Sequence, residues 1–205
     1  MDEATRALIE LSAALGSRDA ARLALALRRA AQAAPAAAVE EALLQSYLFL
    51  GYPAALNAIA LWREQTGRPA PAATPDDWSE WVQRGEQVCA RVYAGQYDRL
   101  RANVARLHPD LERWMVTEGY GKVLGRPGLP LALRELCIVA LLAGLDAEPQ
   151  LYSHLRGALH AGASAEQVEA ALRIADEALV PERAAAARAV WAKVRWRREE
   201  PQDVR

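Results

Sequence analysis

Residues 130–143 read PLALRELCIVALLA, and this stretch decides the fold class. Its apolar side chains recur at spacings of three and one along the chain: Leu133, Leu136, Cys137, Ala140 and Leu141. This spacing places them on one face of an α-helix, and Pro130 suits the first turn of that helix. We therefore predict a helix whose apolar face is buried, with Cys137 as an inert core thiol.

The rest of the chain has the same helical character. Ala and Leu dominate, β-branched residues are sparse, and no stretch alternates with the two-residue period of a strand. A further helix is predicted from about Ala147 to His160, with Gly162 as its stop. Ser164 and Gln167 have the spacing of a capping box, so another helix should begin directly after Ser164. We expect an all-α protein.

A proline-rich segment divides the chain. Residues 67–77 contain three prolines among Ala and Thr, and such a segment cannot continue a helix. We predict a first unit in residues 1–66, a linker in 67–77, and a second unit in 78–196 that begins with an additional helical stretch. The charged segment 197–205 is expected to fray.

The first unit resembles the end of the chain. A shift of 128 positions without gaps (134 − 6 = 128) aligns the two segments. The identities that support the alignment most are Arg6 with Arg134, Leu8 with Leu136, Leu27 with Leu155, Arg28 with Arg156, Glu41 with Glu169 and Pro53 with Pro181. Alanine matches arise by chance in an alanine-rich chain, so they count for less. We predict a tandem duplication of a helical unit.

Composition limits the partners. The chain has 25 Lys and Arg against 26 Asp and Glu, so nothing indicates binding to nucleic acid or to a membrane surface. Its apolar runs are shorter than the ~20 residues that cross a bilayer. The acidic N-terminus lacks the layout of a secretory signal, so we expect a cytoplasmic protein with free thiols at Cys89 and Cys137. The three histidines form no ligand cluster, so no metal site is expected.

Several motifs occur in a fixed order in the second half: Tyr120-Gly121, Arg126-Pro127-Gly128-Leu129, Arg134-Glu135-Leu136, and the run from His154 to Ala163. As a set over roughly residues 110–175, they resemble the carboxymuconolactone decarboxylase / alkylhydroperoxidase-D-like superfamily. The stretch from Glu40 to Asn57 resembles the segment that follows the histidine helix in that family. The resemblance implies an alkylhydroperoxidase-D-like helical bundle, with two degenerate repeats packed as a pseudo-dimer and further assembly into a homo-oligomer.

Peroxidase members of the superfamily use a glutamate and a Cys-x-x-Cys pair followed by a histidine. In this chain the glutamate and histidine positions hold Glu135 and His154, whereas the two cysteine positions hold Ala147 and Gln150. A disulfide cycle needs a thiolate nucleophile and a second sulfur to resolve it. The resemblance therefore implies that this chain is not a thiol peroxidase.

The lactone decarboxylases of the family need no cysteine, metal or other cofactor, and they act on a small anionic lactone. The resemblance implies that His154 is the general acid/base and that Glu135 orients or protonates it. Arg126 and Arg134 are candidates to bind a substrate carboxylate. We further expect one composite pocket, in which residues from both halves contact the substrate: Gln150 from the second half and Tyr47, Tyr52 and Asn57 from the first.

A structural interpretation of the same residues stays open. His154 lies among apolar neighbours, as a core histidine would, and Glu135 can serve in a buried ion pair. Gln150 also stands where decarboxylases tend to have a carboxylate. On this interpretation the chain is a non-catalytic descendant that binds a small molecule or supports an oligomer. An accessible cavity at His154 with an unpaired arginine would favour the enzyme, and a dry, fully hydrogen-bonded ring would favour the alternative.

Overall fold

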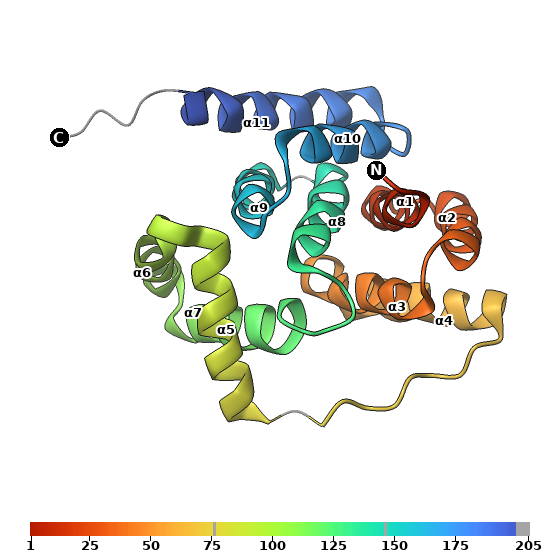
Figure 1. The fold of residues 1–205 in the computed structure, drawn as a ribbon, viewed down its shortest axis with the longest axis horizontal. Coiled ribbons are helices and arrows are strands. Elements are labelled where there is room, and N and C mark those ends of the chain that lie inside the picture. Colours follow the sequence, from red (N-terminus) through yellow and green to blue (C-terminus); the bar gives the residue numbers. More distant parts are fainter. Residues whose placement is uncertain (76, 146, 200–205) are drawn as a thin grey trace.

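The computed structural model describes residues 1–75, 77–145 and 147–199, and within them every regular element is a helix (Figure 1). The predicted all-α fold is confirmed. The elements are α1 Glu3–Ser17, α2 Ala20–Ala33, α3 Ala36–Gln45, α4 Tyr47–Thr66, α5 Trp78–Tyr93, the 3-10 helix η1 Ala94–Gln96, α6 Tyr97–Leu107, α7 Pro109–Trp114, the π-helix η2 Met115–Leu124, α8 Leu131–Ala143, α9 Glu148–Ala161, α10 Ala165–Asp176 and α11 Pro181–Glu199.

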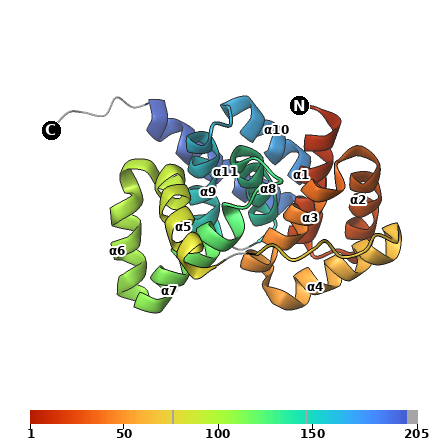
Figure 2. The same ribbon diagram turned by 60° about the horizontal axis from the view of Figure 1, so that its bottom comes forward.

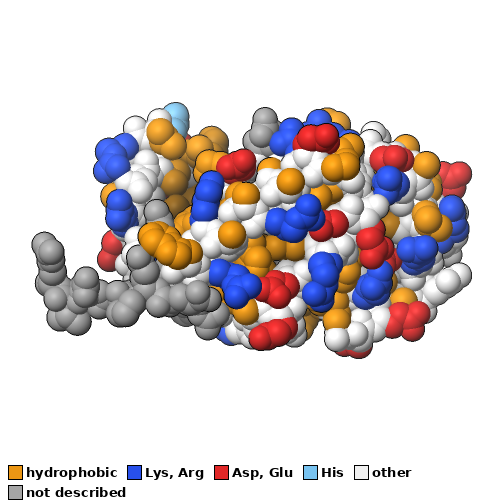
Figure 3. Space-filling view, turned by 90° about the horizontal axis from the view of Figure 1, so that it is seen from above, with side chains coloured by type: hydrophobic (Ala, Val, Ile, Leu, Met, Phe, Trp, Pro, Cys, Tyr) orange, Lys and Arg blue, Asp and Glu red, His pale blue; other side chains and the backbone are white. Residues whose placement is uncertain are grey.

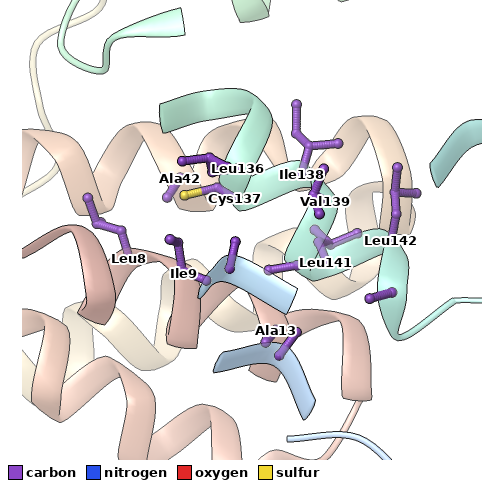
Figure 4. Packing of buried hydrophobic residues seen from close by; sticks show 14 of the residues in the cluster. Leu8, Ile9, Ala13, Ala42, Leu136, Cys137, Ile138, Val139, Leu141 and Leu142 are labelled. Atoms are coloured by element: carbon purple, nitrogen blue, oxygen red, sulfur yellow. The ribbon is translucent and has the colours of Figure 1, made fainter. Parts of the chain in front are cut away.

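Helix α8 lies at the centre of the molecule. It packs against α1, α9, α10 and α11, as the two ribbon views show (Figures 1 and 2). Four of the five residues of the predicted apolar face are buried and Leu133 is half-buried; burial also extends beyond that face, because every residue from Arg134 to Ala143 is buried. Figure 4 shows Cys137 and its neighbours on α8 packed against Leu8 and Ile9 of α1 and Ala42 of α3. Each large apolar side chain buried here contributes about 1.5–3 kcal/mol to stability.

Helices α1 and α8 approach so closely that only glycine fits at their crossing. A Cβ atom at Gly16 would lie 2.2 Å from the backbone oxygen of Leu141, and one at Gly144 would lie 2.6 Å from the carbonyl carbon of Gly16. These glycines are 128 residues apart (144 − 16), as are the first residues of α1 and α8 (131 − 3) and of α2 and α9 (148 − 20). These helices are thus related by the same offset of 128 residues as the predicted repeats. The duplication itself stays a prediction.

Two predicted helix boundaries in the second half are confirmed, namely the stop at Gly162 and the start after Ser164, whereas Pro130 is the residue that precedes α8 and the candidate cap Asp146 lies outside the described residues. Helix α9 ends at Gly162, which takes the left-handed conformation (φ 108°) that favours glycine. The side chain of Ser164 accepts a hydrogen bond from the backbone of Gln167, and the side chain of Gln167 accepts one from the backbone of Ser164. This capping box begins α10 at Ala165.

The segment between the two predicted units has no regular structure where it is described. Helix α4 ends at Thr66, and α5 begins at Trp78. At the other end of the chain α11 continues to Glu199, which lies inside the segment expected to fray. Residues 200–205 of that segment lie outside the described residues.

Helices α5, α6 and α7 and η2 form a lobe that contacts the rest of the molecule mainly through α5 and α9 (Figure 2). Within it, η2 packs directly on α5, since a Cβ at Gly121 would lie 1.9 Å from the backbone oxygen of Trp81. Over the face seen in Figure 3, positive and negative side chains are interspersed. In the described part of the chain, no helix has the length and hydropathy to cross a membrane.

Candidate functional site

Glu135 of α8 and His154 of α9 form a buried hydrogen-bonded pair. Nδ1 of His154 lies 2.7 Å from Oε2 of Glu135, and the two residues are 7 % and 0 % exposed. A carboxylate can only accept, so Nδ1–H donates and the proton of the neutral ring is held on Nδ1. This leaves the lone pair on Nε2, for which the described residues provide no hydrogen-bond partner. The ring is thus oriented as a base.

The approach of α9 to this pair depends on Gly157. A Cβ atom there would lie 3.1 Å from Oε2 of Glu135 and 2.8 Å from a methyl group of Val92. The other carboxylate oxygen, Oε1 of Glu135, is buried and has no hydrogen-bond partner in the described structure. Glycine at 157 therefore lets α9 bring His154 against a carboxylate whose remaining oxygen is unsatisfied.

His154 lines a cavity of about 330 Å³. The ring of Phe49 meets the ring of His154 edge to face, with centroids 5.5 Å apart. The wall is mostly apolar, with side chains from α4, α7 and η2: Leu48, Phe49, Leu111, Trp114, Met115 and Leu124. The cavity suits a small, largely apolar molecule placed against the imidazole.

Glu118 and Gln150 supply polar groups to the wall. The hydroxyl of Tyr47 donates to Oε1 of Glu118 over 3.0 Å, and Lys122 lies 3.9 Å from the same oxygen. Burial and the neighbouring Glu118 raise the pKa of Tyr47, so its hydroxyl stays protonated. The hydroxyl of Tyr47 therefore positions the carboxylate of Glu118, which lines the cavity. Tyr47 itself does not line it.

Two tyrosines complete the wall behind the histidine. The hydroxyl of Tyr120 donates to that of Tyr93 over 3.2 Å, and their rings meet edge to face at 5.9 Å. Burial raises the pKa of Tyr93 to about 12 and that of Tyr120 well above its ordinary value. Both are neutral hydrogen-bonding groups at physiological pH.

The two arginines expected to bind a substrate carboxylate bind a protein carboxylate instead. Nη2 of Arg134 lies 2.7 Å from Oε2 of Glu41, and Nε of Arg126 lies 3.1 Å from Oε1 of the same residue. Arg134 is fully buried and also donates to the backbone oxygen of Leu129. Neither arginine lines the cavity at His154. The enzyme was expected to have an accessible cavity at His154 and an unpaired arginine in it. The structure contains the cavity, and no arginine lines it in the described part of the chain.

Tyr52 and Asn57 do not line the cavity either, although the ring of Tyr52 stacks on that of Tyr47 with centroids 5.1 Å apart. Both are exposed, Tyr52 by 61 %. Helix α4 bends at Gly51, which takes φ 77° and ψ 167°. The helix after the bend therefore runs in a different direction from the first turn. The first half does contribute to the cavity, but through Leu48 and Phe49. Of the predicted contacts, His154 and Gln150 reach the cavity directly.

Sequence reasoning missed Phe49, Tyr93, Trp114 and Glu118. The only sequence signals for these residues were indirect. Phe49 stands two residues from the predicted Tyr47, and Glu118 stands two residues before the Tyr120-Gly121 motif. Glu118 lies in a π-helix, where the 3.6-residue period fails to indicate which side chains share a face.

Neither thiol lines the His154 cavity. Cys89 and Cys137 are fully buried, and burial raises the pKa of each thiol to about 12. The predicted burial of Cys137 is confirmed. Among the described residues, no group of three or more potential ligands is arranged to hold a metal ion.

An all-α bundle with a buried Glu–His pair on neighbouring helices is the architecture that the motifs implied. Residues 109–193 match the model of the carboxymuconolactone decarboxylase family. The chain is 32 % identical over 147 residues to Peroxisomal protein 2 of Schizosaccharomyces pombe, covering 68 % of this chain and 67 % of that protein. It is 29 % identical over 87 residues to 4-carboxymuconolactone decarboxylase of Acinetobacter baylyi, covering 42 % and 65 %. The chain belongs to the carboxymuconolactone decarboxylase family.

Proposed function

We propose that the chain is a cofactor-independent enzyme that performs acid/base chemistry on a small molecule held in the His154 cavity. The supporting observation is the 2.7 Å hydrogen bond between Glu135 and His154 at the wall of that cavity. A hydrogen bond from Nδ1 to a buried carboxylate holds the imidazole in one tautomer and stabilises its charged form. Nε2 is then the atom that takes and returns a proton.

Decarboxylation of a small carboxylated lactone is the reaction we propose to test first, because a relative from Acinetobacter baylyi bears the name of such an enzyme. The bond from the ring carbon to the carboxylate breaks, carbon dioxide leaves, and the electron pair stays on the lactone. A proton from Nε2 of the His154 imidazolium then replaces the carboxyl group, and solvent reprotonates the imidazole. The mostly apolar wall favours this step, because it solvates the ionised carboxylate less well than water does, whereas the carbon dioxide that leaves carries no charge.

The remaining polar groups have defined parts in this proposal. Gln150 donates or accepts a hydrogen bond at the lactone, and Glu118, held by Tyr47, is a second carboxylate within the wall. Glu118 thereby supplies the carboxylate that decarboxylases tend to carry at the position of Gln150, although from a different helix. Arg126 and Arg134 have no part in substrate binding here, because Glu41 engages both.

The test is turnover of a panel of small carboxylated lactones, followed by carbon dioxide release and by the loss of lactone absorbance. We expect wild type to turn over at least one member, His154→Ala to lose at least about 100-fold in rate, and Glu135→Gln to lose part of it. His108→Asn is the matched control, because His108 caps α7 at the surface and Asn caps a helix equally well.

A wild type that is inactive on the whole panel, or an active His154→Ala variant, would overturn the proposal. Either result favours the second candidate, a family descendant that binds a small molecule without converting it or that supports an oligomer. The observation in favour of this candidate is that no arginine or lysine lines the cavity in the described structure.

Assembly and location are proposals as well. We propose a homo-oligomer, since Trp78, Trp114 and Trp196 are each about half exposed and aromatic side chains are enriched at interfaces. Light scattering after size-exclusion chromatography tests this, and a single-chain mass contradicts it. We also propose a cytoplasmic location. Cell fractionation tests it, and a peroxisomal location, which the name of the fission-yeast relative suggests, is the contrary outcome.

A further inference from the structure

A second cavity, of about 320 Å³, has Tyr93 in its wall in common with the His154 cavity. Helices α5, α6 and α9 and the 3-10 helix η1 supply its walls. The two walls differ in chemistry. Where the His154 cavity is mostly apolar, this one presents Gln96, Arg99, Asn103, Arg156 and His160.

The charge of this cavity is uncompensated. Arg99 and Arg156 both line it, and among the described residues no Asp or Glu does. Elsewhere the structure places arginines against carboxylates, as in Arg63 with Glu40, Arg101 with Glu112 and Arg134 with Glu41. In the described residues neither Arg99 nor Arg156 has a carboxylate within 4.0 Å. Two like charges that share a cavity favour the entry of an anion.

One donor, Arg156, and one further polar side chain, His160, are already oriented. The guanidinium carbon of Arg156 lies 5.9 Å from the ring centroid of Tyr152, in a cation–π contact that restrains the side chain. Nδ1 of His160 lies 2.7 Å from the backbone oxygen of Val92, and because a carbonyl only accepts, Nδ1 carries a proton. Nε2 of the neutral ring is then an acceptor, so His160 can bind a hydroxyl or N–H group of a ligand and does not donate to the anion itself. Oriented donors lose less conformational freedom when a ligand binds.

The size and the aromatic walls indicate more than a bare ion. A volume of about 320 Å³ falls in the range of small-molecule sites. Tyr93 and Tyr152 supply ring faces against which a planar body can stack. The guanidinium groups of Arg99 and Arg156 match the paired oxygens of a carboxylate or phosphate.

We propose that this cavity binds an organic oxyanion, namely a small planar molecule that carries a carboxylate or a phosphate group. The site is separate from the proposed catalytic one, and it stands whether or not His154 is catalytic.

Isothermal titration calorimetry with benzoate and with phenyl phosphate tests the proposal on the full chain. We expect one-to-one binding that weakens as sodium chloride is added, because the attraction is electrostatic. Arg156→Ala and Arg99→Ala should each weaken binding by about tenfold or more, since each removes a charge-assisted hydrogen-bond donor. The tighter of the two probes identifies the anionic group that the cavity prefers.

Two controls separate this site from general basicity and from the His154 cavity. Arg173 is an exposed arginine on α10 that does not line the cavity, so Arg173→Ala should bind as wild type does. His154→Ala should also bind normally. Absence of binding up to about 10 mM of either probe, an equal loss in Arg173→Ala, or loss of binding in His154→Ala would overturn the proposal. Arg99 is exposed on α6, so its substitution tests the site even where Arg156→Ala perturbs folding.

Discussion

Arg134 of α8 and Glu41 of α3 form a buried ion pair, with Nη2 of Arg134 2.7 Å from Oε2 of Glu41. The pair joins the two halves of the chain across the linker, and the guanidinium also donates to the backbone oxygens of Arg126 and Pro127. Arg134 thus holds the loop before α8 in place.

Glu41→Ala should destabilise the protein by about 3–5 kcal/mol, because it leaves the Arg134 charge buried without its carboxylate. The free energy of unfolding in urea measures this. Glu177→Ala is the control, since Glu177 pairs with Arg6 at the surface and such pairs contribute about 0–1 kcal/mol. Equal losses in the two variants would show that the buried pair has no special role.

The orientation of the imidazole should depend on Glu135. In wild type we expect neutral His154 to carry its proton on Nδ1, and nitrogen chemical shifts in a histidine-labelled sample report which nitrogen is protonated. Glu135→Ala removes the acceptor 2.7 Å away, so the fraction protonated on Nδ1 should fall. His160, whose Nδ1 lies 2.7 Å from the backbone oxygen of Val92, serves as an internal reference that keeps its tautomer. An unchanged tautomer at His154 would argue against an orienting role.

Gly157→Ala should disturb both packing and the Glu–His pair. The added methyl would lie 2.8 Å from Val92 and 3.1 Å from Glu135, and overpacking of this kind costs about 1–3 kcal/mol. Thermal unfolding followed by circular dichroism measures the loss. The matched control is Gly95→Ala in η1, where an added Cβ meets nothing within 4 Å; a melting temperature as low as that of Gly157→Ala would contradict the packing argument.

The two thiols should be inert in the folded protein and should make stability depend on alkaline pH. Burial raises the pKa of Cys89 and Cys137 from 9.0 to about 12, so the folded state holds both protons where the unfolded state begins to release them. Their contribution to stability is complete below pH 9 and is lost as the pH rises from 9 toward 12. Alkylation by iodoacetamide at pH 8 should therefore require unfolding. Rapid labelling of the native protein would refute this.

The helical fold and the identity of the pair were predictable because both depend on residues close in sequence. The spacing of three and one around Leu136 indicated the buried helix, and Gly162 and the Ser164–Gln167 box marked the ends of helices through local backbone chemistry. Glu135 and His154 lie on consecutive helices, so a family motif sufficed to bring them together.

The cavity wall was less predictable because it depends on how distant helices pack. The charge of Arg134 indicated an anionic partner, but the partner is Glu41, 93 residues away, and no local pattern distinguishes a protein carboxylate from a substrate carboxylate. Similarly, the bend at Gly51 leaves Tyr52 exposed while Phe49 meets His154. A left-handed glycine inside a helix cannot be recognised from apolar spacing.

The glycine crossing of α1 and α8 yields one more prediction. Gly16→Ala and Gly144→Ala should each cost about 3 kcal/mol, because the added methyl meets backbone atoms that cannot move aside. Both act on the same contact, so the double variant should cost less than the sum of the two, as a double-mutant cycle in urea would measure. Strict additivity would show that the two positions are independent.

That crossing also determines how the chain unfolds. The linker separates α1 from α8 in the sequence. In the structure, however, the backbones of these two helices are in contact, and the contact has no room for a methyl group. Neither half of the chain can keep its packing once the other half has unfolded. The polypeptide should therefore melt in a single cooperative transition, and a fragment cut within the linker should regain native helix only when its complement is added back.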